Sequence, residues 1–291
     1  MKILLAATIG FVLLALLVAA CSPVGTLNAL VPSDTHLLTQ DVAYGTDPRQ
    51  KLDIYQPRTT APAKGFPTLV FFYGGAWNRG DRTDYKFVGE ALASRGILAI
   101  LADYRLYPQV RYPDFLRDSA AVLAWARRET PRLGGDPQRL FVMGHSAGAY
   151  NAAMLALDAR WLAGEGLSPA VLAGWIGLAG PYDFFPMTNA DAQPVFFHPA
   201  YPKDSQPIDF AGPAAPPAFL AAAQTDALVN PERNTRQLAQ KLVAANVPVI
   251  LRFYEKPDHA TLIGAFARPL RWIAPVLDDV SAFVRDQPSS R

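Results

Sequence analysis

Short apolar runs alternate with longer amphipathic segments along most of the chain. Several of the short runs are apolar throughout, as expected for strands that are buried on both faces of a parallel sheet. These strand-like runs cover residues 51–55, 68–72, 97–101, 140–143, 173–178, 218–222 and 249–253. Segments 115–126, 234–245 and 272–284 carry apolar residues at helical spacing. The alternation predicts an α/β fold, with one domain over residues 37–287 built on a doubly wound, mostly parallel sheet.

Residues 181–217 interrupt this alternation with many prolines and aromatic residues between two predicted strands. A loop of that length without secondary structure is uncommon unless it has a function, such as covering a site. We therefore predict a lid-like insertion. Its aromatic side chains either line a pocket or pack the lid itself, and both remain open for Phe184, Phe185, Phe196, Phe197 and Tyr201.

The N-terminal stretch has the features of a targeting segment. Met1-Lys2 supplies a positive charge, residues 3–20 are almost wholly apolar, and small residues precede Cys21, the only cysteine. This combination is typical of a secretory signal. The stretch resembles a bacterial lipoprotein signal, which implies a signal peptide over residues 1–20 and lipidation of Cys21. An uncleaved membrane anchor, which needs about 20 residues, and an ordinary secreted protein are the alternatives.

The lipoprotein resemblance has consequences for location and partners. It implies a membrane-anchored protein of the bacterial cell envelope that faces the periplasm or the exterior, with the lipid membrane as a partner through acylated Cys21. Residues 21–36 contain Pro, Gly, Asn and Ser without a periodic pattern, so we expect a tether there. The mature chain would have no cysteine left for a disulfide, and its fold would rest on packing alone.

Composition narrows the classes of function. Half of the 291 residues are apolar, enough for a sizeable core, and the net charge of +2 gives no field that would attract nucleic acid. The only basic residue before position 49 is Lys2. We find no His, Asp and Glu cluster with metal-ligand spacing and no glycine-rich phosphate loop. The sequence therefore predicts neither a metal nor a cofactor.

The segment Gly144-His145-Ser146-Ala147-Gly148 fits the G-x-S-x-G pattern between a predicted buried strand and a predicted helix. In that context the small residues allow a very tight turn, which holds the serine in a strained, exposed conformation. The N-terminus of the following helix offers N–H groups to a developing oxyanion. The alternative is a glycine-rich turn with a helix-capping serine. The strand and helix on either side favour Ser146 as a nucleophile.

A glycine pair follows an earlier predicted strand, in Tyr73-Gly74-Gly75-Ala76-Trp77. Glycines at this position let the backbone approach a substrate carbonyl closely and direct N–H groups at it. An ordinary glycine turn is the alternative. The glycine pair lies two predicted strands before the serine turn, and this position favours an oxyanion hole.

These motifs resemble a known family. Residues 73–77 with Arg79-Gly80-Asp81 resemble the His-Gly-Gly-Gly-Trp…Gly-Asp segment of carboxylesterases related to hormone-sensitive lipase, with Tyr73 in place of the histidine and Ala76 in place of the third glycine. The resemblance covers residues 40–287 and is closest to small feruloyl/acetyl-esterase-like and kynurenine-formamidase-like members. It implies an α/β-hydrolase fold and oxyanion donors at Gly74, Gly75 and Ala147. Its further support comes from residues 103–106 and 134–137.

The order of residues in this fold is serine, then acid, then histidine. His259 follows the last predicted strand, whereas His36, His145 and His198 fall in the tether, the serine turn and the insertion. Asp226 follows the preceding strand in the Asp-x-x-Val context where the family places its acid. The alternatives are a helix-capping role for Asp226 and the competing Asp209 in the insertion.

The sequence thus predicts a serine hydrolase in which Ser146, Asp226 and His259 cleave small or short-acyl carboxylic esters through an acyl-enzyme. One alternative is an amide or formamide hydrolase that uses the same three residues. The other is a non-catalytic surface lipoprotein on the same fold, supported by the altered glycine segment. The expected partner is a small-molecule ester.

Overall fold

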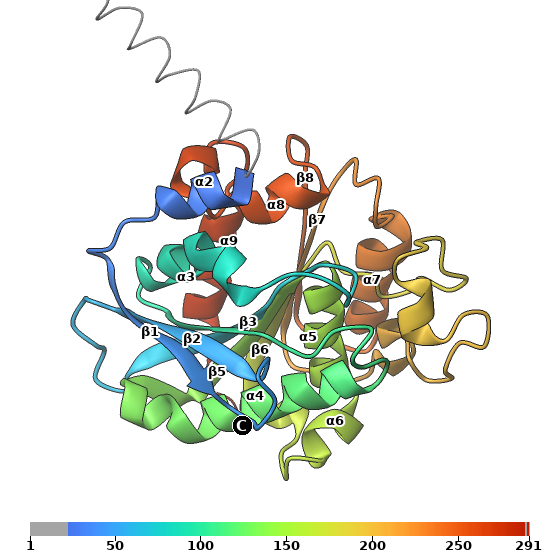
Figure 1. Ribbon diagram of the computed structural model, residues 1–291, viewed down its shortest axis with the longest axis horizontal. Helices are drawn as coiled ribbons and strands as arrows, with labels where there is room; N and C mark the ends of the chain where they lie inside the picture. The colour runs from blue at the N-terminus through green and yellow to red at the C-terminus, as the bar shows by residue number, and fades with distance from the viewer. Residues whose placement is uncertain (1–22, 289, 291) are drawn as a thin grey trace, which may run out of the picture.

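The computed structural model describes residues 23–288 and residue 290. Its centre is an eight-stranded sheet with the order β1-β2-β4-β3-β5-β6-β7-β8 (Figure 1). β2 pairs antiparallel with both β1 and β4, and the remaining neighbours are parallel. The strands are β1 (His36–Ala43), β2 (Lys51–Pro57), β3 (Phe66–Phe72), β4 (Leu98–Ala102), β5 (Gly135–His145), β6 (Leu172–Leu178), β7 (Ala218–Ala223) and β8 (Val249–Tyr254).

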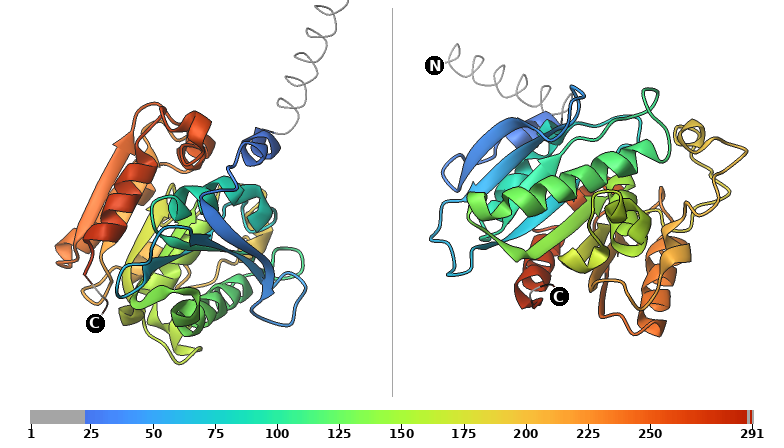
Figure 2. Two further views of the ribbon diagram at one scale, coloured as in Figure 1. Left: turned by 90° about the vertical axis from the view of Figure 1, so that its left-hand side faces the viewer. Right: turned by 90° about the horizontal axis from the view of Figure 1, so that it is seen from below.

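Helices cover both faces of this sheet, with α3 and α9 on one face and α4, α5 and α6 on the other (Figure 2). The α-helices are α2 (Pro23–Ala29), α3 (Lys86–Ala93), α4 (Asp114–Glu129), α5 (Ala147–Leu157), α6 (Ala159–Ala163), α7 (Gln237–Ala244), α8 (His259–Gly264) and α9 (Val276–Asp286). Short helices are η1 (Arg82–Tyr85), η2 (Thr130–Leu133), η3 (Pro169–Val171), η4 (Gln193–Phe196), η5 (Pro207–Phe210), η6 (Glu232–Arg236, a π-helix) and η7 (Arg268–Leu270). The predicted α/β class with a mostly parallel sheet is confirmed.

The apolar runs of the sequence are the central strands. Every residue of β3, β4, β6 and β7 is buried, because helices cover both sides of these strands. β1 has no counterpart among the predicted strands. It is an antiparallel edge strand, and most of its residues are exposed, so it lacks the apolar pattern that marks a buried strand.

The segment between β6 and β7, predicted as a lid-like insertion, contains only the short helices η4 and η5. Its aromatic residues divide between two roles. Phe196 is fully buried and its ring lies 4.9 Å from that of Trp77 and 6.0 Å from that of Phe115. Phe184 instead lines the cavity described below. The insertion therefore packs against α4 and the loop after β3 through one aromatic residue and contributes another to a pocket wall.

Part of the predicted tether is helical. The amide of Asn28 on α2 donates to the Thr83 carbonyl at 2.8 Å, and its oxygen accepts from the Phe87 N–H at 3.4 Å. Leu27 and Val31 pack against the core. The predicted signal peptide and Cys21 lie outside the described residues. Within the described part of the chain, no helix has both the length and the apolar character needed to cross a bilayer.

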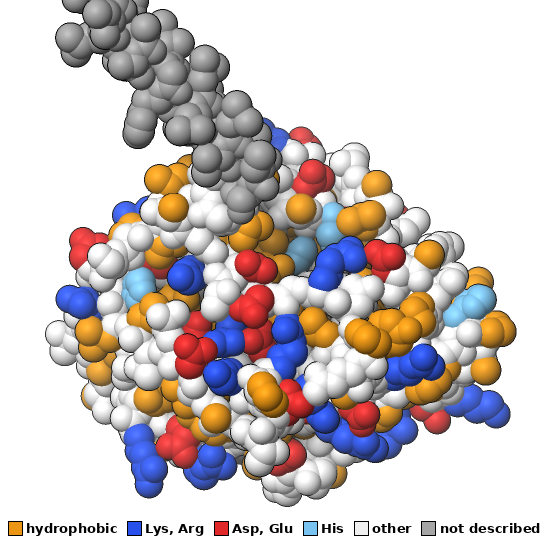
Figure 3. All heavy atoms as spheres, in the orientation of Figure 1, with side chains coloured by type: hydrophobic (Ala, Val, Ile, Leu, Met, Phe, Trp, Pro, Cys, Tyr) orange, Lys and Arg blue, Asp and Glu red, His pale blue; other side chains and the backbone are white. Residues whose placement is uncertain are grey.

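The surface agrees with the modest net charge. On the face shown in Figure 3, basic and acidic side chains lie interspersed, and no extended area carries a single sign of charge. That face therefore offers no continuous positive surface of the kind that binds nucleic acid.

The aromatic contact between α9 and the sheet gives a test of the core. The Phe283 ring lies 6.2 Å from that of Phe141 and 5.9 Å from that of Phe219. We expect Phe283→Ala to lower the free energy of unfolding by about 3–5 kcal/mol, because it leaves a cavity between helix and sheet. Urea unfolding measures this. Trp272→Ala, at a side chain that is 72% exposed, is the control and should change stability by less than about 0.5 kcal/mol.

Candidate active site

Ser146 occupies the turn between β5 and α5. Its backbone has φ 54° and ψ −121°, a conformation that non-glycine residues rarely adopt. The glycines on either side are required by close approach. A Cβ on Gly144 would lie 2.0 Å from the Gly148 carbonyl oxygen, and one on Gly148 would lie 2.0 Å from the Phe72 carbonyl oxygen. The turn is therefore the strained strand-to-helix elbow that the sequence predicts.

His259 is the first residue of α8, directly after the loop that follows β8. Its Nε2 atom lies 2.9 Å from Ser146 Oγ. The neighbouring Asp258 caps the helix, and its side chain accepts a hydrogen bond from the Thr261 N–H at 2.7 Å. The Asp258 carboxylate is therefore bound to the backbone of α8. The cap fixes the start of α8 and with it the position of the His259 ring.

Asp226 lies in the loop after β7, next to the loop after β8 because these two strands pair. One carboxylate oxygen is 2.7 Å from His259 Nδ1, and the other accepts from the N–H groups of Leu228 and Val229 at 2.8 and 2.9 Å. Burial alone would raise the pKa of Asp226, but its hydrogen bonds to His259 and to the two N–H groups lower it below the ordinary value. Asp226 is therefore held as a carboxylate.

These contacts select one tautomer of His259. Because the carboxylate of Asp226 accepts the proton on Nδ1, Nε2 keeps its lone pair and can accept the hydroxyl proton of Ser146. The arrangement can generate a serine nucleophile and then carry the proton to a leaving group. The structure thus brings together all three residues that the sequence singled out, from the ends of β5, β7 and β8.

The predicted oxyanion donors lie beside Ser146. Gly74 allows the loop after β3 to approach Ser146, since a Cβ there would lie 2.8 Å from the Ser146 Cβ. Burial raises the pKa of the Tyr85 hydroxyl to about 12, and the nearby backbone N–H of Gly74 opposes the rise. Gly74 is therefore the least available of the predicted donors.

Three other backbone N–H groups near Ser146 could donate a hydrogen bond to a bound molecule. Among the described residues, no backbone hydrogen bond engages the N–H of Gly75, Ala76 or Ala147, and all three residues line the cavity beside Ser146. Ala147 is the first residue of α5, where an N–H has no partner within the helix. Ala76 was not among the predicted donors, which were Gly74, Gly75 and Ala147. Its place directly after the glycine pair was the available signal.

A cavity of about 400 Å³ opens above these groups. Trp77, Phe184 and Met187 form an apolar wall, and the polar residues Arg79, Asp84 and Asn189 also line the cavity. The indole N–H of Trp77 donates to Asn151 at 3.0 Å, which fixes this part of the wall.

The other histidines and Asp209, which the sequence offered as alternatives, lie away from Ser146 Oγ or bond to a backbone group. His36 is on β1 and packs against Tyr55, and His198 is in the insertion. Asp209 is exposed on η5, while His259 has Asp226 as its carboxylate partner. His145 donates from Nε2 to the His259 carbonyl at 2.9 Å. Within the described residues, no group of three or more His, Cys, Asp or Glu side chains could hold a metal ion.

The chain is similar in sequence to a protein family and to known esterases. The BD-FAE family model matches residues 52–242. Esterase LipC of Mycobacterium tuberculosis is 32% identical over 224 residues, which cover 70% of this chain and 55% of that protein. Isoprenylcysteine alpha-carbonyl methylesterase ICME of Arabidopsis thaliana is 34% identical over 154 residues, covering 52% of this chain and 36% of that protein. The chain thus spans about a third to a half of the length of these relatives.

Solved structures share the fold over nearly the whole chain. A bacterial heroin esterase superposes with a TM-score of 0.73 at 23% identity, covering 92% of this chain and 91% of that chain. The carboxylesterase EstE1, cloned from a metagenomic library, gives 0.71 at 19% identity, covering 92% and 95%. At these identities the likeness concerns the fold, which is that of the α/β-hydrolases.

The buried His145 predicts a pH dependence of stability. Burial and the neighbouring His259 lower its pKa from 6.5 to about 3. Between these values the unfolded chain binds a proton that the folded chain excludes, so this residue makes the fold less stable as the pH falls. His145→Gln keeps an N–H donor but does not titrate. Its stability should therefore fall less steeply than that of the wild type, by up to about 1.4 kcal/mol per pH unit. Urea unfolding between about pH 7 and about pH 4.5 measures the two slopes, and parallel slopes would contradict the prediction.

Proposed function

Because the chain belongs to the BD-FAE family and has the α/β-hydrolase fold, we propose that it is a serine hydrolase of carboxylic esters with Ser146 as nucleophile. The observation that carries the proposal is the continuous contact from Ser146 Oγ to His259 at 2.9 Å and from His259 to Asp226 at 2.7 Å. This contact lies beside a cavity into which unpaired backbone N–H groups open. Related proteins named as esterases and a methylesterase support the same reaction type.

The proposed reaction follows from the positions of these groups. His259 accepts the hydroxyl proton as Ser146 Oγ attacks the ester carbonyl carbon, and the N–H groups of Gly75, Ala76 and Ala147 stabilise the oxyanion. Protonated His259 then gives its proton to the departing alcohol, which leaves an acyl-enzyme. Water attacks that ester with His259 again as base, and the acid is released. Asp226 keeps the tautomer and balances the charge on the imidazole in both steps.

We propose that the preferred esters carry short acyl groups. The cavity volume of about 400 Å³ lies at the lower end of the range of ligand pockets. Its apolar wall of Trp77, Phe184 and Met187 stands beside the nucleophile, where an acyl chain would lie. A series of p-nitrophenyl esters of increasing chain length tests this part, with kcat/KM expected to fall beyond the short chains.

The central test uses variants of the three residues. Ser146→Ala should lower kcat for p-nitrophenyl acetate by several orders of magnitude, and Asp226→Asn by about 10⁴-fold, because the asparagine selects the wrong tautomer of His259. Labelling of the wild type by a fluorophosphonate probe at Ser146 checks the nucleophile directly. Equal turnover by wild type and Ser146→Ala would refute the assignment. Faster hydrolysis of N-formylkynurenine than of the acetyl ester would instead favour amide chemistry.

We also propose that the protein is held at a membrane of the cell envelope through lipidated Cys21. Support comes from the sequence before Pro23 and from α2. Asn28 joins α2 to Thr83 and Phe87, and the neighbouring Asp84 and Tyr85 line the cavity. Cys21 is separated from α2 by one residue in the sequence, so a lipid there would attach the protein next to α2, which contacts the segment that includes Asp84 and Tyr85.

Cys21→Ser is the matched test of this location. In a bacterial host that lipidates proteins, wild type should fractionate with membranes and incorporate labelled palmitate, whereas Cys21→Ser should do neither. The variant should retain esterase activity, since Ser146, Asp226 and His259 all lie far from Cys21 in the sequence. Membrane association of Cys21→Ser equal to that of the wild type would exclude the lipid as the attachment.

A further inference from the structure

The loop over residues 73–80 is strained. Ala76 and Trp77 adopt positive φ angles of 50° and 57° in succession, and Gly75 and Gly80 have φ values of 129° and 108°. A non-glycine residue in this region costs roughly 1–3 kcal/mol and persists only where its surroundings fix it. This loop carries the N–H groups of Gly75 and Ala76. Contacts from outside the loop must therefore maintain the shape on which those donors depend.

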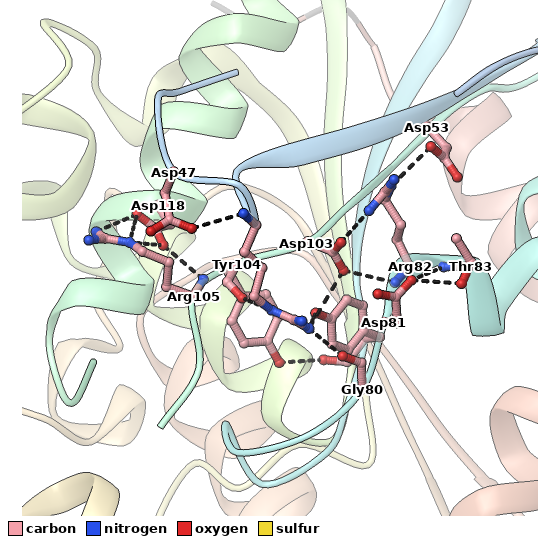
Figure 4. Close-up of polar contacts among 12 residues, drawn as sticks. Asp47, Asp53, Gly80, Asp81, Arg82, Thr83, Asp103, Tyr104, Arg105 and Asp118 are labelled. Atoms are coloured by element: carbon pink, nitrogen blue, oxygen red, sulfur yellow. Dashed lines mark hydrogen bonds and ion pairs between the residues drawn. The ribbon is translucent and has the colours of Figure 1, made fainter. Parts of the chain in front are cut away.

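One arginine from a distant segment contacts both ends of the loop. Arg49 lies in the connection between β1 and β2, and its Nη2 atom donates to the Tyr73 hydroxyl at 2.7 Å and to the Gly80 carbonyl. Its Nε atom donates to the Tyr104 carbonyl at 2.9 Å. Figure 4 shows Gly80, Tyr104 and Asp103 converging on this point. The planar guanidinium thus fixes three groups relative to one another.

Tyr73 provides the second contact. Its ring stacks between Tyr85 and Tyr104, with centroids 5.7 and 5.0 Å away. Gly80 packs against the same ring, since a Cβ there would lie 2.7 Å from two ring atoms. The Tyr104 hydroxyl donates to the Tyr73 carbonyl at 2.9 Å. In a trans peptide the C=O and N–H point in opposite directions, so this bond also sets the direction of the Gly74 N–H.

Charge at this position is balanced by carboxylates, of which Asp53 and Asp103 are buried and Asp41 is exposed. Asp103 lies 3.8 Å from Arg49 and accepts from the Arg82 backbone N–H at 2.9 Å. The Arg82 guanidinium contacts Asp103 and Asp41, and Asp53 at 2.9 Å. Burial opposes the charge on Arg49, but Tyr73 and Asp103 raise its pKa above the ordinary value. Arg49 therefore stays charged while it holds the loop.

We propose that Arg49 and Tyr73 form a positioning pair for the oxyanion hole, holding residues 73–80 in the shape that leaves the N–H groups of Gly75 and Ala76 open to a substrate carbonyl. Neither residue touches the reacting atoms. Tyr73 stands where related esterases carry a histidine, and Arg49 reaches its hydroxyl from outside the loop. The inference rests on the proposed esterase reaction and adds to it the residues that set its oxyanion geometry.

The test compares Arg49→Met and Tyr73→Phe with the wild type, because each removes the polar contact and keeps most of the side-chain volume. We expect kcat for p-nitrophenyl acetate to fall about tenfold or more in each, with KM within about threefold. The Ki for trifluoroacetophenone, whose adduct with Ser146 places an oxyanion in the hole, should rise by the same factor as kcat/KM falls. The double variant should lose little more kcat than Arg49→Met, since both substitutions break the same contact between Arg49 and the Tyr73 hydroxyl.

Arg105→Met is the matched control. The Arg105 side chain is 26% exposed, as is that of Arg49, and its guanidinium bonds to Asp118 and not to the loop. We expect a comparable loss of melting temperature in Arg49→Met and Arg105→Met, but a loss of kcat and of inhibitor affinity only in Arg49→Met. Arg49→Lys keeps the charge but lacks the planar guanidinium with its several donors. Its kcat and Ki should lie between those of the wild type and Arg49→Met.

Two results would overturn the inference. In one, kcat and Ki of Arg49→Met stay within twofold of the wild type, and Ser146→Ala is inactive, so that the proposed function stands without this pair. In the other, Arg49→Met and Arg105→Met lose kcat equally and Ki does not follow, which would show a general effect on stability. Should Tyr73→Phe fail to fold, the comparison of Arg49→Met, Arg49→Lys and Arg105→Met decides the question alone.

Discussion

The site depends on how closely three backbone segments meet at the end of β5. Gly148 at the start of α5 packs so tightly against β3 that a side chain would collide with the Phe72 carbonyl. The same approach places Gly74 directly beside Ser146, so one steric constraint sets the position of both Ser146 and the loop that faces it. The strain at Ser146 is tolerated because the buried strands on either side cannot shift without losing their packing.

The remaining chemistry is positioned by the parallel order of β7 and β8. Their carboxyl ends adjoin, so the loops that follow bring Asp226 and His259 within 2.7 Å of each other. Each residue is also fixed by the backbone around it, Asp226 through two N–H groups and His259 through the cap of α8. Such support keeps the polar groups preorganised, and a preorganised site reacts without first reorienting its dipoles.

Paired charged side chains lie beside the loop over residues 73–80, and Arg49 joins them to it. Arg82 contacts Asp41, Asp53 and Asp103, and Asp103 also lies near Arg49. A buried charge is tolerated when it is paired and hydrogen-bonded, and removing one partner leaves the other uncompensated. The network is therefore most stable when complete, and Arg49 connects it to Tyr73 and Gly80, at the two ends of residues 73–80.

The sequence by itself determined the central strands, the serine turn and the three residues in contact at the site. Each has a local signature, such as an apolar run before Ser146 or a polar residue just after an apolar strand, because burial and tight turns restrict residue types nearby in the chain. Only the tertiary structure decided the contacts of Arg49, the surroundings of the Ala76 N–H and the docking of α2. Arg49 meets Tyr73 and Gly80 across 24 and 31 residues, and such contacts leave no periodic pattern to read. The availability of the Ala76 N–H likewise depends on which partners the fold brings to its neighbours.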